Sequence, residues 1–202
     1  MRIGLDFDNT IVSYDRLFHK VALERALIPA DLPQNKLLVR DYLRKIGQED
    51  DWTEMQGLVY GARMDEADIF EGCLDFLRAA RQAGCTLFII SHKTARPFRG
   101  PPYDLHKAAR HWVENTLNEV MPSDHVFFEV TKDAKLGRAA DCRCDIFVDD
   151  LPEILLAPGF PPDTRRILFD PEAHHPANEA WQSVASWQAL RDVLEPQWPS
   201  RP

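Results

Sequence analysis

The sequence lacks three features that would place it in a familiar class at once: an excess of basic charge, a long apolar run and paired metal-spaced cysteines. Its 24 Lys and Arg residues are outnumbered by 32 Asp and Glu residues, and the formal net charge is −8. This balance disfavours binding to a nucleic-acid polymer. No stretch approaches the ~20 consecutive apolar residues that a membrane helix needs, so we expect no membrane partner.

The cysteines are few and form no CxxC pair. Two of them are separated by a single residue, which is too close for an ordinary disulfide bond. We expect all four to be free thiols in a reducing compartment. The first residues carry no signal-peptide pattern, so we expect a cytoplasmic protein. The cysteines are Cys73, Cys85, Cys142 and Cys144.

Short apolar runs alternate with helical patterns along most of the chain, which predicts an α/β fold. A Rossmann-like, mostly parallel sheet with helices on both faces accounts for this order. The apolar runs cover residues 2–7, 87–90, 126–130, 145–148 and 166–169. Helical patterns cover residues 73–80, 104–120 and 187–194, with Ser186 as a plausible N-cap of the last.

One segment near the N-terminus contains no convincing strand. Helical patterns occupy about residues 16–26, 36–45 and 53–64 instead. We expect residues 13–68 to form a small all-helical insertion, and residues 1–12 and 69–202 to form the α/β core. Such an insertion would sit over the carboxyl end of the sheet, where ligands bind in open α/β folds, so it is a candidate lid.

Polar side chains follow three of the predicted strands at the point where each strand ends. Asp6 and Asp8 end the first, Ser91 and His92 end the second, and Asp149-Asp150 end the fourth. In a parallel sheet these groups share one edge, and close carboxylates repel each other unless a cation separates them. Oxygen ligands suit Mg²⁺, so we predict a magnesium site of the phosphoryl-transfer kind.

The spacing of the first two aspartates suggests a division of work. Residues i and i+2 of an extended strand point to the same side. Asp6 can then attack a phosphorus atom and form an aspartyl-phosphate, while Asp8 handles the proton of the leaving oxygen. The alternative for an isolated Asp-x-Asp is a turn or a helix cap. The three polar strand ends taken together favour the catalytic interpretation.

These motifs resemble those of the haloacid dehalogenase (HAD) superfamily of phosphatases. Residues 4–11, Gly-Leu-Asp-Phe-Asp-Asn-Thr-Ile, match its Asp-x-Asp-x-Thr motif, residues 87–91 match the strand that ends in Ser or Thr, and residues 145–150 match the strand that ends in paired acids. The resemblance implies a HAD-type fold in which the helical insertion is a cap. It also implies that Asp6 is the nucleophile and a metal ligand.

The resemblance implies further roles for the other motif residues. Asp8 is the general acid/base, with its backbone carbonyl on the metal, and Thr10 supports it at the substrate site. Ser91 hydrogen-bonds the phosphoryl group, assisted by the backbone N–H of His92. Asp150 binds the metal directly and Asp149 lies behind it, although the reverse order stays open.

The family also uses a lysine, and this chain offers two candidates between the third and fourth strands. We favour Lys135, which we expect to begin a turn over residues 135–138 that leads to the fourth strand. Lys132 is the alternative. Whichever is not used is expected to be a solvated surface charge.

The expected activity is magnesium-dependent hydrolysis of a small phosphorylated metabolite, such as a sugar phosphate. The acid at Asp8 favours phosphate esters over carbon–halogen bonds, because a halide leaves without a proton. Three alternatives stay open: a nucleotide 5′-phosphatase, a phosphotransferase, and a non-catalytic binding module on the same fold. The sequence leaves the oligomeric state open.

Overall fold

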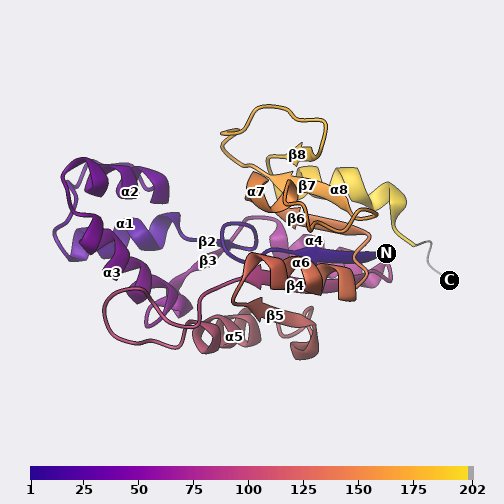
Figure 1. Ribbon diagram of the computed structural model, residues 1–202, viewed down its shortest axis with the longest axis horizontal. Helices are drawn as coiled ribbons and strands as arrows, with labels where there is room; N and C mark the ends of the chain where they lie inside the picture. Colours follow the sequence, from indigo (N-terminus) through magenta and orange to yellow (C-terminus); the bar gives the residue numbers. More distant parts are fainter. Residues whose placement is uncertain (200–202) are drawn as a thin grey trace. The chain divides into compact units, whose positions relative to one another are not determined.

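A six-stranded parallel sheet is the central element of the chain (Figure 1). In this computed structural model, which describes residues 1–199, the strand order is β5-β4-β1-β6-β7-β8 and every neighbouring pair is parallel. The predicted α/β class with a parallel sheet is thereby confirmed. The strands are β1 (Arg2–Leu5), β4 (Thr86–His92), β5 (Val126–Glu129), β6 (Ile146–Asp149), β7 (Arg165–Phe169) and β8 (Gln182–Val184).

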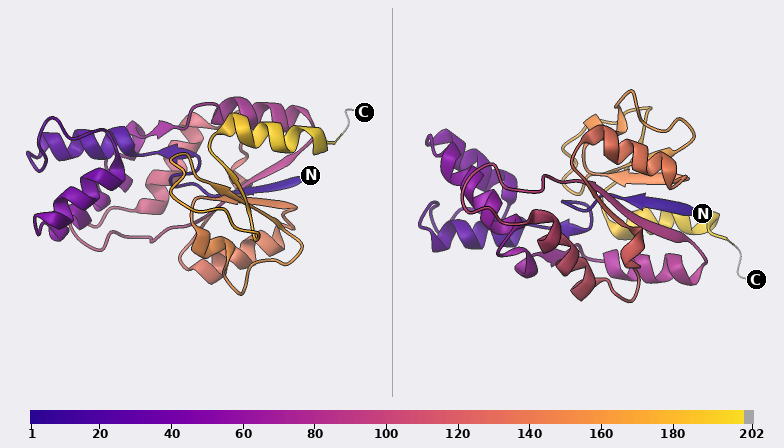
Figure 2. Two further views of the ribbon diagram at one scale, coloured as in Figure 1. Left: turned by 90° about the horizontal axis from the view of Figure 1, so that it is seen from above. Right: turned by 60° about the horizontal axis from the view of Figure 1, so that its bottom comes forward.

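Helices cover both faces of the sheet, as a parallel sheet requires. Two helices, α4 (Cys73–Gln82) and α8 (Trp187–Leu194), lie together on one face, and α6 (Lys132–Asp141) and α7 (Pro152–Leu155) lie on the other (Figure 2). Ser186 caps α8 as predicted, since its hydroxyl accepts a hydrogen bond from the backbone N–H of Ala189 at 3.1 Å. The remaining short turns here are η2 (Ser123–His125) and η3 (Glu195–Gln197).

The core under α6 and α7 is built from apolar side chains of β4, β6 and β7. Phe88, Phe147 and Leu168 are all at most 4% exposed. Gly4 in β1 permits this packing, because a Cβ there would lie 2.5 Å from the ring of Phe147. The four cysteines are free and buried, as the sequence predicts.

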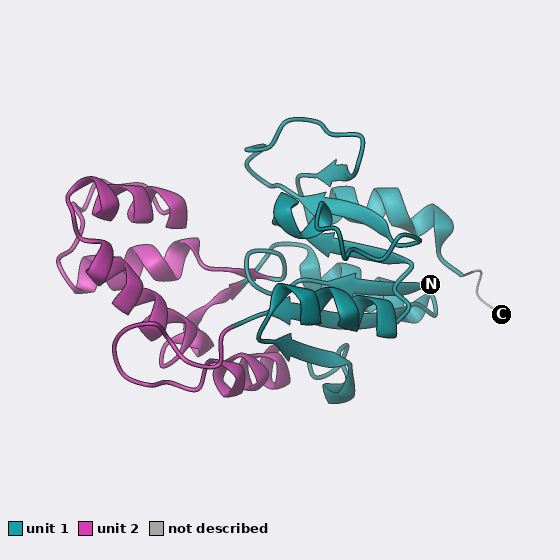
Figure 3. Ribbon diagram, in the orientation of Figure 1, with its two compact units in different colours: residues 1–11, 69–93, 117–202 teal, residues 12–68, 94–116 magenta. Residues whose placement is uncertain are grey.

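The chain divides into two units (Figure 3). The first contains the sheet and comprises residues 1–11, 69–93 and the described residues from 117 onward. The second comprises residues 12–68 and also 94–116. From the sequence, residues 94–116 were expected in the core, and that core was expected to extend to residue 202, of which 200–202 lie outside the described residues.

The second unit is mainly helical. Its helices are α1 (Asp15–Glu24), α2 (Lys36–Lys45), α3 (Glu49–Tyr60), η1 (Met64–Glu66) and α5 (Leu105–Thr116). A two-stranded sheet of β2 (Val12–Ser13) and β3 (Asp68–Ile69) lies where the chain enters and leaves residues 12–68. Among residues 1–199, no helix has the length and apolar character needed to cross a bilayer.

Aromatic packing and two close backbone approaches hold the second unit together. The Phe18 ring lies 4.8 Å from that of Trp52, measured between centroids. A Cβ at Gly57 would stand 2.8 Å from Pro97, and one at Gly61 would stand 2.6 Å from Tyr103. These two glycines in and after α3 let the 94–104 loop pack against it, which explains why 94–116 groups with 12–68.

Three local expectations were wrong in detail. Helix α3 begins at Glu49 rather than near residue 53, because three acidic residues in its first turn favour the positive end of the helix dipole. Residues 135–138 are not a turn: they lie inside α6, which Thr131 caps by accepting from the backbone N–H of Ala134. Strand β8 was missed because Gln182-Ser183-Val184 is short and mostly polar.

Candidate active site

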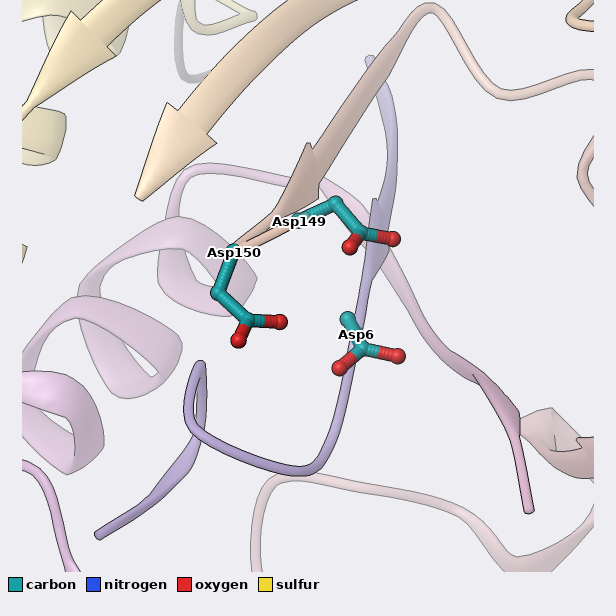
Figure 4. A group of neighbouring side chains, drawn as sticks. All are labelled: Asp6, Asp149 and Asp150. Carbon is teal, nitrogen blue, oxygen red and sulfur yellow. The ribbon is translucent and has the colours of Figure 1, made fainter. Parts of the chain in front are cut away.

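Three carboxylates meet at the carboxyl ends of β1 and β6 (Figure 4). The side chains of Asp6, Asp149 and Asp150 each offer an oxygen, and these oxygens lie within 4.8 Å of one another. The parallel pairing of β1 with β6, in which Leu5 is opposite Val148, brings these distant parts of the chain together. The backbone N–H of Asp6 donates to the carbonyl of Val148 at 2.9 Å, which fixes the first carboxylate against β6.

A buried lysine lies between two of these carboxylates. Nζ of Lys135 is 2.6 Å from Oδ1 of Asp6 and 2.6 Å from Oδ2 of Asp149. The side chains of Lys135, Asp6 and Asp149 are 2%, 6% and 0% exposed. Charges this deeply buried are stable only as partners of each other. With one ammonium and three carboxylates, the group carries a formal charge of −2.

Burial and neighbouring charges shift the pKa values of Asp149 and Lys135. Burial raises the pKa of Asp149, and the negative charge of Asp6 adds to this, while Lys135 opposes it. Burial lowers the pKa of Lys135, but the charges of Asp149 and Asp6 outweigh burial and raise it above its ordinary value. The lysine therefore stays charged at neutral pH.

The two aspartates at the end of β6 have different partners. Asp149 uses both oxygens within the protein, since Oδ1 accepts from the backbone N–H of Leu151 at 3.0 Å and Oδ2 accepts from Lys135. Asp150 is half-buried, and its Oδ2 accepts from Nδ2 of Asn9 at 3.2 Å. Asn9 has a φ of 58°, a left-handed conformation that Asn tolerates better than most residues. The loop after β1 thus orients Asp150.

The second aspartate of the Asp-x-Asp pair is held by another lysine. Nζ of Lys93 lies 2.9 Å from Oδ1 and 2.7 Å from Oδ2 of Asp8. The side chain of Lys93 is 4% exposed and that of Asp8 is 22% exposed. Lys93 follows the Ser91-His92 pair on β4, the strand beside β1. Lys93 and Asn9 were not predicted as site residues, because their partners Asp8 and Asp150 lie on other segments.

The remaining predicted site residues lie at the same edge of the sheet. Thr10 is fully buried and its carbonyl accepts from Nε1 of Trp187 at 3.1 Å, while its hydroxyl has no hydrogen-bond partner among residues 1–199. Ser91 is buried near the end of β4, and His92 is half-buried as the last residue of that strand. Their predicted contacts with a phosphoryl group stay predictions.

The two candidate lysines lie in different environments on the same helix. Lys132 is in the first turn of α6 and forms an exposed ion pair with Glu153 at 2.7 Å, with side-chain exposures of 47% and 59%. Lys135 is one turn deeper and reaches the carboxylates. Of these two lysines, only Lys135 contacts carboxylates of the Asp6, Asp149 and Asp150 group.

Solved structures with the same fold complete this description. A HAD family hydrolase from Deinococcus radiodurans, solved with bound phosphate and sodium, has a TM-score of 0.58 at 18% identity and covers 96% of this chain and 95% of its own. The chain has the HAD fold. No protein-family model matches it, and no curated protein matches its sequence significantly.

Two further solved structures share this fold, and their names describe different activities. Protein tyrosine kinase A of Mycobacterium tuberculosis has a TM-score of 0.60 at 17% identity and covers 96% of this chain and 97% of its own. A phosphoserine phosphohydrolase-like protein from Francisella tularensis has a TM-score of 0.56 at 13% identity and covers 96% and 99%. At such identities the HAD fold is shared, and the function has to be argued from the site.

Proposed function

We propose that this protein is a magnesium-dependent phosphohydrolase that acts on a small phosphorylated metabolite through an aspartyl-phosphate on Asp6. One observation carries the proposal: a buried ammonium, Lys135, lies between Asp6 and Asp149 with the carboxylate of Asp150 within reach. A purely structural cluster would gain nothing from a third acid at this position, because like charges destabilise one another. The neighbour from Deinococcus radiodurans, solved with phosphate, fits the same proposal.

The donor set suits a hard divalent cation. Three carboxylate oxygens within 4.8 Å of one another are the ligand type that Mg²⁺ prefers. The formal charge of −2 of the group would be balanced by one such ion. Asp150 is the stronger candidate for direct ligation, because both oxygens of Asp149 already accept hydrogen bonds. When bound, the cation would supply electrostatic stabilisation of the phosphoryl oxygens.

The chain's own residues account for the covalent steps. A carboxylate oxygen of Asp6 attacks the phosphorus, a phosphorus–oxygen bond forms, and the bond to the leaving alkoxide breaks as Asp8 gives that alkoxide a proton. Water then attacks the phosphorus of phosphorylated Asp6 and gives a proton to Asp8. The bond from phosphorus to Asp6 breaks, and inorganic phosphate leaves. Lys135 holds Oδ1 of Asp6 throughout.

The proposed setting is the cytoplasm, and the proposed partner is a small soluble phosphate ester. Four buried free thiols fit a reducing compartment. The negative net charge gives no bulk attraction for a nucleic-acid polymer. A sugar phosphate or a similar metabolite is the proposed substrate class.

Phosphate release from a panel of sugar phosphates, nucleotides and p-nitrophenyl phosphate tests this proposal. We expect release with Mg²⁺ from at least one member, loss with chelator, and a fall of at least about 10³-fold in Asp6→Asn. The matched control is Asp163→Asn, which changes an exposed aspartate and should retain activity.

Each contrary outcome has a distinct meaning. Release that survives Asp6→Asn would exclude the proposed nucleophile. Transfer of phosphate to an acceptor without hydrolysis would make the protein a phosphotransferase. Absence of turnover and of phosphorylated protein on every member of the panel would support a binding module instead.

A further inference from the structure

The contact between Lys93 and Asp8 is more buried than the surface ion pairs of Lys20 and Lys132. Lys93 is 4% exposed and engages both carboxylate oxygens of Asp8, at 2.9 and 2.7 Å. The exposed pair of Lys132 with Glu153 is the surface counterpart, with exposures of 47% and 59%. Burying an ammonium costs several kcal/mol unless a partner compensates it. The Asp8 carboxylate therefore compensates the charge of the buried Lys93 ammonium.

Two rigid neighbours fix the position of Lys93. Its backbone N–H donates to the carbonyl of Glu129 at 2.8 Å, which continues the pairing of β4 with β5. Its ammonium lies 5.7 Å from the centre of the Phe7 ring, within the range of a cation–π contact. The sheet and an aromatic ring thus position the group that holds Asp8.

Each aspartate of the Asp-x-Asp pair consequently has a lysine of its own. Lys135 on α6 holds Asp6, and Lys93 at the end of β4 holds Asp8. The first contact belongs to the group of three carboxylates, whereas the Asp8 carboxylate is outside that group. A different lysine therefore positions each of these two carboxylates.

We propose that Lys93 is a positioning residue that holds the Asp8 carboxylate in place to accept a proton from water when phosphorylated Asp6 is hydrolysed. This inference rests on the proposed function. In that step the oxygen of water bonds to phosphorus, the phosphorus–oxygen bond to Asp6 breaks, and the proton of water passes to Asp8. The carboxylate whose two oxygens Lys93 holds is the group that receives this proton.

The two steps of the reaction respond differently to this role. With p-nitrophenyl phosphate the leaving group is a stable anion, so formation of the phosphorylated enzyme does not depend on a proton from Asp8. Hydrolysis of the phosphorylated enzyme does depend on Asp8 as a base. Loss of the Lys93 contact should therefore slow the second step and spare the first.

The test is stopped-flow and steady-state hydrolysis of p-nitrophenyl phosphate with Mg²⁺ by wild type, Lys93→Met and Lys93→Arg. We expect Lys93→Met to lower kcat by about 10-fold or more and KM by a similar factor, and thus to leave kcat/KM within about twofold. A burst of p-nitrophenol and accumulation of phosphorylated protein should accompany this change. Lys93→Arg keeps two donors for the carboxylate and should restore part of kcat.

Two comparisons keep the result interpretable. Lys132→Met removes an exposed ammonium and should leave both constants unchanged. KM does not depend on the fraction of folded enzyme, so a fall in KM cannot come from partial unfolding of Lys93→Met. In an Asp8→Asn background, the Lys93→Met change should have no further effect on hydrolysis of the phosphorylated enzyme.

Three results would overturn the inference. A rise in KM with a lower kcat/KM would make Lys93 a ligand of the substrate phosphate. Equal constants in wild type and Lys93→Met would remove any role in the reaction. An equal fall of phosphorylation and hydrolysis would indicate a general structural role. If the wild type forms no phosphorylated Asp6 at all, the proposed function fails first, and that outcome is separate.

Discussion

Replacement of Lys135 by methionine is the sharpest test of the buried charge group. The substitution keeps most of the side-chain volume but removes an ammonium that lies 2.6 Å from Asp6 and 2.6 Å from Asp149. Three carboxylates within 4.8 Å of one another then lack their cation. Breaking a buried pair by removing one partner costs about 3–5 kcal/mol. We expect a loss of that size in the free energy of unfolding of the metal-free protein at neutral pH.

The pH dependence of this loss has a definite sign. Burial already raises the pKa of Asp149 above its ordinary value of 3.8, and removal of Lys135 would raise it further. The folded variant then binds more protons than the unfolded chain above that value, so its stability falls as the pH rises. The loss relative to wild type should therefore be smaller at about pH 4 than at about pH 7.

Divalent cation should reverse part of the loss. The charge of the group is −2 in wild type and −3 in Lys135→Met, so Mg²⁺ should stabilise the variant more than the wild type. Saturation at 100 times the dissociation constant corresponds to about 2.7 kcal/mol for a single site. Urea unfolding followed by circular dichroism, in chelator and in Mg²⁺, measures both effects.

The control lies three residues away on the same helix. Lys132→Met removes an exposed pair and should change stability by no more than about 1 kcal/mol, with no dependence on Mg²⁺. If Lys135→Met loses no more stability than Lys132→Met, the reasoning from burial is wrong. If Mg²⁺ stabilises both variants and the wild type equally, the metal does not bind at this carboxylate group.

Two further predictions concern the loop after β1 and the second unit. Asn9→Gly keeps the left-handed conformation but removes the hydrogen bond to Asp150, so we expect roughly 10-fold weaker Mg²⁺ binding by calorimetry; an unchanged affinity would contradict the orienting role. In the second unit, Arg63 and then Lys20 lower the pKa of Glu66 to about 2, from 4.5. Glu66 is 35% exposed, so after allowance for screening Glu66→Gln should cost about 0.5–1 kcal/mol. The difference in stability between Glu66→Gln and wild type should be full above about pH 4.5 and shrink as the pH falls towards 2. Thermal unfolding across that pH range measures it. A difference that does not change with pH would contradict a role of the ion pairs.

The parts of the fold that depend on residues close in sequence could be predicted from local patterns. The apolar runs of five strands and the capped helix from Trp187 to Leu194 follow from side-chain periodicity and a serine at the N-cap. Asp6, Asp8 and the Asp149-Asp150 pair were identified because several polar strand ends would share one edge of a parallel sheet, where close carboxylates repel each other without a cation. The HAD resemblance rests on these same residues, and the structure confirms the parallel-sheet α/β core that the resemblance implied.

The partners of these residues depended on the tertiary structure. The parallel pairing of β1 with β6 unites Asp6 with Asp149, and α6 presents Lys135 rather than Lys132 to them. A short window of sequence encodes neither the strand order nor which distant carboxylates a lysine on a helix will reach. For the same reason Lys93, which was not predicted as a site residue, was recognised as the partner of Asp8 only once β4 lay beside β1. The sequence by itself determined which strands end in acids, because strands and their polar ends are local properties; only the tertiary structure decided which cation meets which acid, because that contact joins residues far apart in the chain.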